Sequence, residues 1–143
     1  MNLSPHFTLE ELTRSDTARK LGLDNTPESF LIPNLSKTAY GMEEVRTLLG
    51  DKPILISSGY RSHKVNLAVG SKNPNSQHTI GCAVDFTCPQ FGDPEAIVRK
   101  IVDSEINFDQ VIQEHKSWVH ISFSDRNRKQ ALVIDGAGTR SFA

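Results

Sequence analysis

The sequence predicts an α+β protein in which N-terminal helices pack on a small antiparallel sheet. Three observations lead to this expectation. Helix signals dominate the first third of the 143 residues, short alternating apolar segments follow residue 53, and 37% of the residues are hydrophobic. That hydrophobic content is enough for one core without disulfide or metal staples. The length is typical of one domain, so we expect a single domain over residues 1–143.

The N-terminal helices are predicted by their end signals. Thr8 and Glu11 have the spacing of a capping box, and a second short helix is expected over residues 16–21, ended by a glycine. Thr-Pro at 26–27 and Ile-Pro at 32–33 mark two further helix starts. The longest helix is expected after the second of these, where apolar residues recur at helical spacing: Leu35, Ala39, Met42, Val45 and Leu49.

After residue 53 the pattern becomes that of half-buried strands, in which apolar and polar residues alternate. We predict strands over residues 54–56, 82–86, 110–114, 118–123 and 131–134. Between them, Asp93 and Pro94 predict the start of a helix. Its buried stripe is expected to contain Ile97, Val98, Ile101 and Val102. Helices first and strands later favour an antiparallel sheet.

The charge balance excludes several classes of partner. Sixteen Lys and Arg residues oppose seventeen Asp and Glu residues, so the net charge is −1. A protein that binds nucleic acid or an anionic membrane normally has a basic excess, and we therefore expect neither partner. Arg126, Arg128 and Lys129 form a short basic stretch without interleaved aromatic residues, which we expect to be a solvated loop.

Neither a membrane segment nor a signal peptide is expected. No apolar run approaches the roughly 20 residues that a membrane-spanning helix needs. Residues 1–5 do not resemble the start of a signal peptide. The two cysteines, Cys82 and Cys88, make neither a disulfide framework nor a complete cysteine zinc site. We therefore expect synthesis in a cytoplasm.

Two histidines and one aspartate form the strongest candidate site. His78, Asp85 and His120 are together a complete protein ligand set for a catalytic zinc, with one position left for water or substrate. Asp85 and His120 each alternate with apolar residues, so both should point away from the core on neighbouring strands. From the ligand types alone, ordinary hydrogen bonds between these side chains are the alternative.

Three short motifs follow one another along the chain. They are SSGYRS (57–62), SQHTIGCAVD (76–85) and WVH (118–120). In this order they resemble the S-G-Y-R-S, S-x-H-x-x-G-x-A-x-D and W-x-H motifs of the zinc D-Ala-D-Ala carboxypeptidase family. That family includes the vancomycin-resistance D,D-dipeptidases and the phage L-alanyl-D-glutamate endolysins. Residues 7–11 and 24–27 resemble its short phage and prophage branch.

The resemblance implies a hedgehog/D,D-peptidase-like fold in which the sheet carries one zinc ion, bound by His78, Asp85 and His120. It also implies that Arg61 lies in the substrate pocket, where a guanidinium can pair with a carboxylate or a polarised carbonyl. A surface salt bridge is the alternative for Arg61. Two further candidates for substrate binding are Ser76, whose alternative is turn capping, and Trp118, whose alternative is an ordinary half-buried position on the sheet.

The general base is the part of the predicted site at which this sequence departs from the family motif. Ser117 stands where better-known members of the family have Asp or Glu, and a serine cannot act as the base at neutral pH. Glu114 is the expected substitute, because a three-residue hairpin loop over 115–117 would place it on the same face of the sheet as His120. A solvated hairpin position is the alternative for Glu114. The lesser candidates for the base are Asp109 and His115.

The residues and the resemblance together predict a zinc metallopeptidase. We expect it to hydrolyse a peptide bond in peptidoglycan stem peptides, as a carboxypeptidase or an endolysin-type endopeptidase, with Glu114 and Arg61 as catalytic side chains. The alternative is a non-catalytic, zinc-containing module that binds cell wall or serves as a structural part of a phage; Ser117 keeps this alternative open. We expect a monomer, made in the bacterial cytoplasm, that acts on the wall after release or as a phage product.

Overall fold

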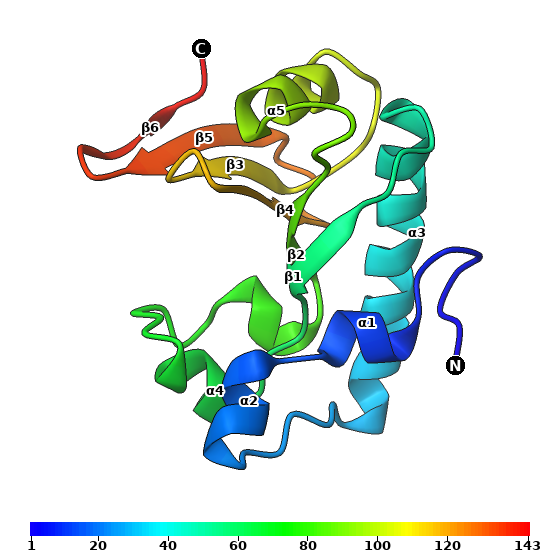
Figure 1. Cartoon of the computed structure of the whole chain (residues 1–143), viewed down its shortest axis with the longest axis vertical. Coiled ribbons are helices and arrows are strands. Elements are labelled where there is room, and N and C mark those ends of the chain that lie inside the picture. The colour runs from blue at the N-terminus through cyan, green and yellow to red at the C-terminus, as the bar shows by residue number, and fades with distance from the viewer.

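The computed structural model describes residues 1–143 and contains five α-helices and one six-stranded sheet (Figure 1). The helices are α1 (Leu9–Thr13), α2 (Asp16–Leu21), α3 (Ile32–Leu48), α4 (His63–Ala68) and α5 (Pro94–Val102), with 3-10 turns η1 (Ser29–Leu31) and η2 (Gln77–Ile80). The strands are β1 (Leu55–Ser58), β2 (Ala83–Thr87), β3 (Gln110–Glu114), β4 (Trp118–Ser122), β5 (Gln130–Asp135) and β6 (Gly138–Ser141). The predicted α+β class is confirmed. No helix combines the length and the apolar character that crossing a membrane requires.

The predicted N-terminal caps are confirmed. The Thr8 hydroxyl accepts a hydrogen bond from the Glu11 backbone N–H at 3.1 Å, and the Glu11 carboxylate accepts one from the Thr8 N–H at 3.3 Å. Helix α2 ends at Gly22, whose φ of 65° is left-handed and suits a residue without Cβ. Helix α3 begins at Ile32, directly before Pro33, as predicted.

The predicted helix start at residues 26–27 is wrong. No helix begins there, and the first helical turn after it is η1. Side-chain hydrogen bonds hold this segment in a non-helical form. The Asp24 carboxylate accepts from the Thr26 N–H at 2.9 Å, while Asn25 donates to the carbonyls of Thr13 and Tyr60. Asparagine and aspartate thus offer the backbone an alternative to a helix.

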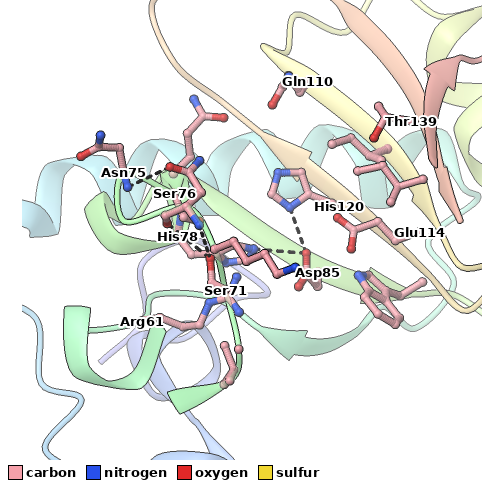
Figure 2. A pocket seen from close by; sticks show the side chains of 18 of the residues that line it. Arg61, Ser71, Asn75, Ser76, His78, Asp85, Gln110, Glu114, His120 and Thr139 are labelled. Atoms are coloured by element: carbon pink, nitrogen blue, oxygen red, sulfur yellow. Dashed lines mark hydrogen bonds and ion pairs between the residues drawn. The ribbon is translucent and has the colours of Figure 1, made fainter. Parts of the chain in front are cut away.

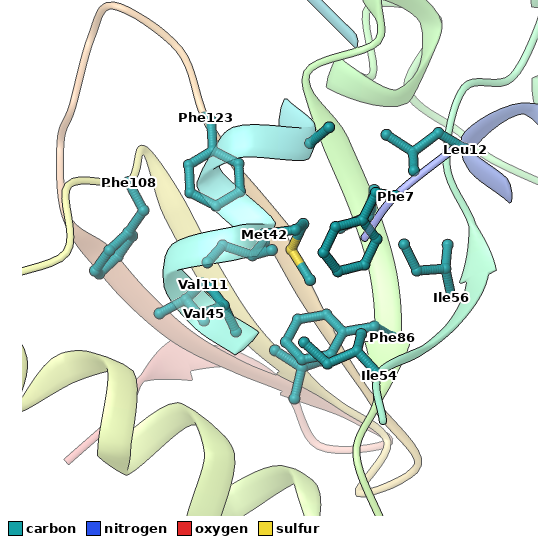
Figure 3. Packing of buried hydrophobic residues seen from close by; sticks show 14 of the residues in the cluster. Phe7, Leu12, Met42, Val45, Ile54, Ile56, Phe86, Phe108, Val111 and Phe123 are labelled. Atoms are coloured by element: carbon teal, nitrogen blue, oxygen red, sulfur yellow. The ribbon is translucent and has the colours of Figure 1, made fainter. Parts of the chain in front are cut away.

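The two faces of the sheet have different tasks. Helices α3 and α5 contribute to one hydrophobic core with alternate residues of β2, β3 and β4. Figure 3 shows Met42 and Val45 of α3 packed near Phe86 and Val111 of the sheet. The opposite face carries the polar side chains that alternate with these core residues, and it lines a cavity.

The sheet is mixed, which corrects the expectation of an antiparallel one. Strand β5 pairs with β3 in parallel, and all other neighbours are antiparallel. Strand β4 already lies between β2 and β3, so the chain leaving β4 must cross the end of β3 before it can pair again. A strand that returns from there runs antiparallel to β4 and therefore parallel to β3. Strand β6, which is exposed throughout and shows no apolar alternation, was not predicted.

Helix α5 differs from its prediction at one residue. The Asp93 side chain accepts a hydrogen bond from the Ala96 N–H at 2.9 Å, which confirms the predicted cap. Ile97, Val98 and Ile101 are buried as expected, and helix α5 contacts β3 and β4. Val102 is 42% exposed, because as the last helical residue it lies beyond the edge of the packed face.

Candidate metal centre

The three predicted ligands come from three separate segments and meet in space. His78 lies in η2, Asp85 in β2 and His120 in β4, where Asp85 and His120 are directly paired across the two strands. One potential ligand atom from each residue lies within 4.8 Å of the other two. Figure 2 shows the three side chains pointing toward one another on the cavity side of the sheet. This arrangement could hold a metal ion.

His78 is oriented by the turn that carries it. The Ser76 hydroxyl accepts a hydrogen bond from the His78 backbone N–H at 3.2 Å and so caps η2. The ring Nδ1 lies 2.7 Å from the carbonyl oxygen of Gly59. Since a carbonyl only accepts, Nδ1 carries the proton and Nε2 presents a lone pair. That Nε2 lies 3.2 Å from Asp85 Oδ1.

The electrostatics of the group favour a bound cation. Burial lowers the pKa of His78, so its ring is neutral near pH 7. Burial also acts to raise the pKa of Asp85, but the two neighbouring imidazoles outweigh it and hold that pKa well below its ordinary value. An ionised carboxylate oxygen and a neutral imidazole nitrogen are the forms in which these side chains bind a metal ion.

His120 completes the set from the neighbouring strand. Its Nδ1 lies 3.0 Å from the same Asp85 Oδ1, and its ring stands edge-on to that of His78, with the centroids 5.1 Å apart. His120 is 9% exposed and His78 only 2%, so the ligand atoms are shielded from bulk water. Ligands held in place before the ion arrives lose little freedom when it binds.

Glu114 lies where the hairpin geometry predicts. It pairs with Trp118 across β3 and β4, and a three-residue loop over 115–117 joins the two strands. Its side chain lines the cavity together with those of Trp118 and His120. Figure 2 shows Glu114 near His120 on this side of the sheet. Burial and the nearby Asp85 carboxylate raise the pKa of Glu114 above its ordinary value. A half-buried carboxylate of this kind is well placed to accept and return a proton near the metal group.

Arg61 also lines the cavity, and its backbone ties it to the metal group. Its N–H donates to the His78 carbonyl at 3.0 Å. Burial lowers the pKa of Arg61, while the Asp85 and Glu114 carboxylates act to raise it; a guanidinium remains charged in either case. Its Nε is buried without a hydrogen-bond partner. The surface salt bridge considered for this residue is not formed.

The other predicted site residues occupy more ordinary positions. Ser76 and Trp118 line the cavity, but the Ser76 hydroxyl is already used as the cap of η2. His115, in the hairpin loop, also lines the cavity, and its ring lies 5.7 Å from the Trp118 ring. Asp109 is fully buried and does not line the cavity. Hydrogen bonds from Arg128 hold the pKa of Asp109 well below its ordinary value, which makes this carboxylate a poor base.

The basic stretch after β4 is a solvent-exposed loop, as predicted, but it also borders the site. Arg126 and Arg128 line the same cavity of about 1080 Å³ as the metal group. The sequence showed only a short cationic segment. The loop over 123–129 crosses the end of β3, and this crossing brings Arg126 and Arg128 to the cavity. It occurs because β4 lies between β2 and β3 in the sheet.

The comparison with known protein families covers most of the chain. A model described as peptidase M15 matches residues 5–122. No curated protein sequence matches the chain. The matched region includes His78, Asp85 and His120, together with Arg61 and Glu114. A match over more than half of the chain establishes membership, and the chain therefore belongs to the peptidase M15 family.

Proposed function

We propose that this protein is a zinc-dependent peptidase that hydrolyses a peptide bond in peptidoglycan stem peptides. The observation that carries the proposal is the convergence of His78, Asp85 and His120 beside the half-buried carboxylate of Glu114 in one cavity. Two nitrogen donors and one carboxylate are a common ligand set for catalytic zinc. Tetrahedral zinc with bonds of roughly 2.0–2.1 Å separates its ligand atoms by about 3.4 Å. The separations of 3.0 and 3.2 Å at Asp85 are close to this value.

Each residue has a distinct task in this mechanism. Zinc, when bound, lowers the pKa of a water molecule and polarises the scissile carbonyl. Glu114 accepts the proton of the attacking water and delivers it to the departing nitrogen. Arg61 stabilises the negative charge that develops on the carbonyl oxygen. Ser117, in the hairpin loop, takes no part in proton transfer.

The substrate class rests on the motif resemblance and on the polarity of the cavity. The cavity presents charged and amide side chains with few apolar ones, as suits a polar peptide better than a hydrophobic ligand. Both a terminal residue and an internal bond could be accommodated beside the metal group, so carboxypeptidase and endopeptidase action are two forms of this proposal. In either form the protein acts after it has gained access to the cell wall.

Digestion of purified peptidoglycan tests the proposal directly. The zinc-loaded protein is incubated with peptidoglycan sacculi, and the released muropeptides are identified by mass spectrometry. We expect new free amino groups and shortened stem peptides, lost on chelation and restored by added zinc. The mass of the product identifies the bond. Retention on the sacculi without any cleavage would instead favour a cell-wall-binding module.

A further inference from the structure

Arg126 and Arg128, in the loop between β4 and β5, both line the cavity. Only Arg128 forms an ion pair with an acidic side chain. The guanidinium of Arg128 forms a bidentate pair with Asp109, with distances of 2.7 and 2.8 Å. Asp109 is fully buried and also accepts a hydrogen bond from Gln77 at 3.0 Å. Arg128 therefore stabilises the loop, and the Asp109 carboxylate compensates its charge.

Arg126 has no such partner. Its side chain forms no hydrogen bond and no ion pair with any other residue. The neighbouring Asp125 is paired with Lys37 at 2.5 Å and does not line the cavity. The acids that do line the cavity, Asp85 and Glu114, belong to the metal group and the proposed base. The cavity thus contains an uncompensated guanidinium.

The loop that carries Arg126 has a defined shape. The Arg126 N–H donates to the Ser124 hydroxyl at 3.3 Å, and the Arg128 N–H donates to Asp109 at 3.2 Å. The Lys129 N–H donates to the Phe108 carbonyl at 3.1 Å. The backbone on both sides of Arg126 is therefore held in place. A cationic side chain on a fixed backbone loses less freedom on binding than one on an unrestrained loop.

The strand register places Arg126 on a particular side of the metal group. His120 lies in the middle of β4, whose first residue pairs with Glu114 and whose last residue, Ser122, pairs with Gln110. The loop of Arg126 follows Ser122, about 7 Å beyond His120 at the usual strand rise. Arg126 and Glu114 therefore approach the metal group from opposite ends of the strands, so a peptide lying along this face could reach both.

We infer that Arg126 binds a carboxylate of the substrate and so determines specificity for anionic peptides. A guanidinium presents paired donors that match the two oxygens of a carboxylate. Stem peptides offer two sources of this group: the C-terminal α-carboxylate and the carboxylate of an acidic residue. The inference rests on the proposed peptidase function. It does not follow from family membership, because Arg126 lies beyond residue 122, where the family match ends.

Lys72 is the competing cation. It also lines the cavity and forms no ion pair, but it lies in the loop between α4 and η2. An ammonium group is a point charge and does not offer the paired donors of a guanidinium. Substitution of each residue separately distinguishes the two.

The test compares three synthetic stem pentapeptides: the free acid, a form amidated at the C-terminus, and a form amidated at the acidic side chain. Binding to the zinc-loaded protein is measured by calorimetry, and kcat/KM is measured alongside. The variants are Arg126→Gln, Lys72→Gln and Lys129→Gln. Lys129 is the matched control, because it belongs to the same exposed loop but does not line the cavity.

We expect the wild type to bind the free acid at least tenfold more tightly than one of the two amidated forms. The position of the amide in that weakly bound form shows which carboxylate Arg126 binds. Arg126→Gln should remove this preference by weakening binding of the free acid at least tenfold, since hydrogen bonds between charged groups are the strong ones. Lys129→Gln should leave the preference unchanged. Equal binding of all three peptides by the wild type, or loss of the preference in Lys72→Gln instead, would overturn the inference. If the peptides bind but are not cleaved, the peptidase function is refuted. The binding measurements still show whether Arg126 recognises a carboxylate.

Discussion

Backbone contacts position the three side chains that could hold a metal ion. The Gly59 carbonyl fixes the proton of His78 on Nδ1, and the pairing of β2 with β4 sets Asp85 opposite His120. Such supporting contacts orient ligands before the ion binds and set their protonation. The site is therefore built from ordinary backbone geometry, and the unusual feature is only that three acceptors share one small volume.

Glu114→Gln tests the proposed base. The substitution keeps the size of the side chain but removes its ability to accept a proton. We expect kcat to fall by roughly 10²–10⁴-fold, the usual contribution of general acid–base catalysis. Zinc content, measured by atomic emission, should stay at one ion per chain. Glu44→Gln, at an exposed position of α3, is the control and should retain full activity. Substantial activity in Glu114→Gln would show that another group is the base.

The pH dependence of catalysis tests the same residue independently. Because burial raises the pKa of Glu114, the proposed base is protonated at a higher pH than an exposed glutamate. Activity requires the deprotonated form, so kcat/KM should be high above the raised pKa and fall as the pH drops through it. The acidic limb of the pH profile of kcat/KM should therefore lie above 4.5, the ordinary pKa of a glutamate side chain. Zinc content is measured at each pH, since loss of metal would produce a similar fall.

At the scale of elements, close packing of α1 against the segment after β1 supports the metal group. The Tyr60 N–H donates to the Leu12 carbonyl at 2.7 Å, and the preceding residue, Gly59, holds His78 through its own carbonyl. A Cβ at Gly59 would overlap the Leu12 carbonyl oxygen. Glycine is therefore required here because two backbones approach each other, and not because of an unusual φ.

Gly59→Ala should consequently destabilise the protein and weaken metal binding together. We expect a loss of about 2–3 kcal/mol in the free energy of unfolding, as for other overpacked positions. Urea denaturation of the metal-free protein measures this loss. Gly136→Ala is the matched control, because no atom lies within 4 Å of its added Cβ; it should change the stability by less than about 0.5 kcal/mol. Equal stability of the two variants would contradict the packing argument.

At the scale of the molecule, one sheet separates the hydrophobic core from the cavity. Strands β2, β3 and β4 contribute apolar residues to the helix-covered face and polar residues to the other. The core therefore holds the strand register, and the register sets Asp85 opposite His120, while His78 reaches them from η2. Binding of an ion between these strands should stabilise the entire fold.

Thermal unfolding with and without zinc tests this coupling. A ligand that binds only the folded state stabilises it by about 2.7 kcal/mol when its free concentration is 100 times the Kd. We expect a rise of several degrees in the Tm of the wild type when chelated protein is supplied with zinc. His120→Ala, which lacks one ligand, should show a much smaller rise. An identical Tm of the wild type with and without zinc would contradict metal binding at this site.

Local sequence patterns were sufficient for the features that depend on neighbours in the chain. Alternation along β2 and β4 placed Asp85 and His120 on the face away from the core, and hairpin length placed Glu114 beside them. The caps of α1, α2 and α5 were likewise readable from a few adjacent residues. Residue types made His78, Asp85 and His120 the candidates, the motif resemblance implied that they bind one zinc ion, and the structure brings them together.

The tertiary structure decided what depends on strand order. The parallel pairing of β5 with β3 follows from β4 already having two neighbours, a constraint that no local pattern expresses. That crossing brings Arg126 to the cavity and buries Asp109 beneath Arg128. A sequence determines on which side of its own strand a residue lies, because alternation is local; which distant loop covers that side depends on how the whole chain packs.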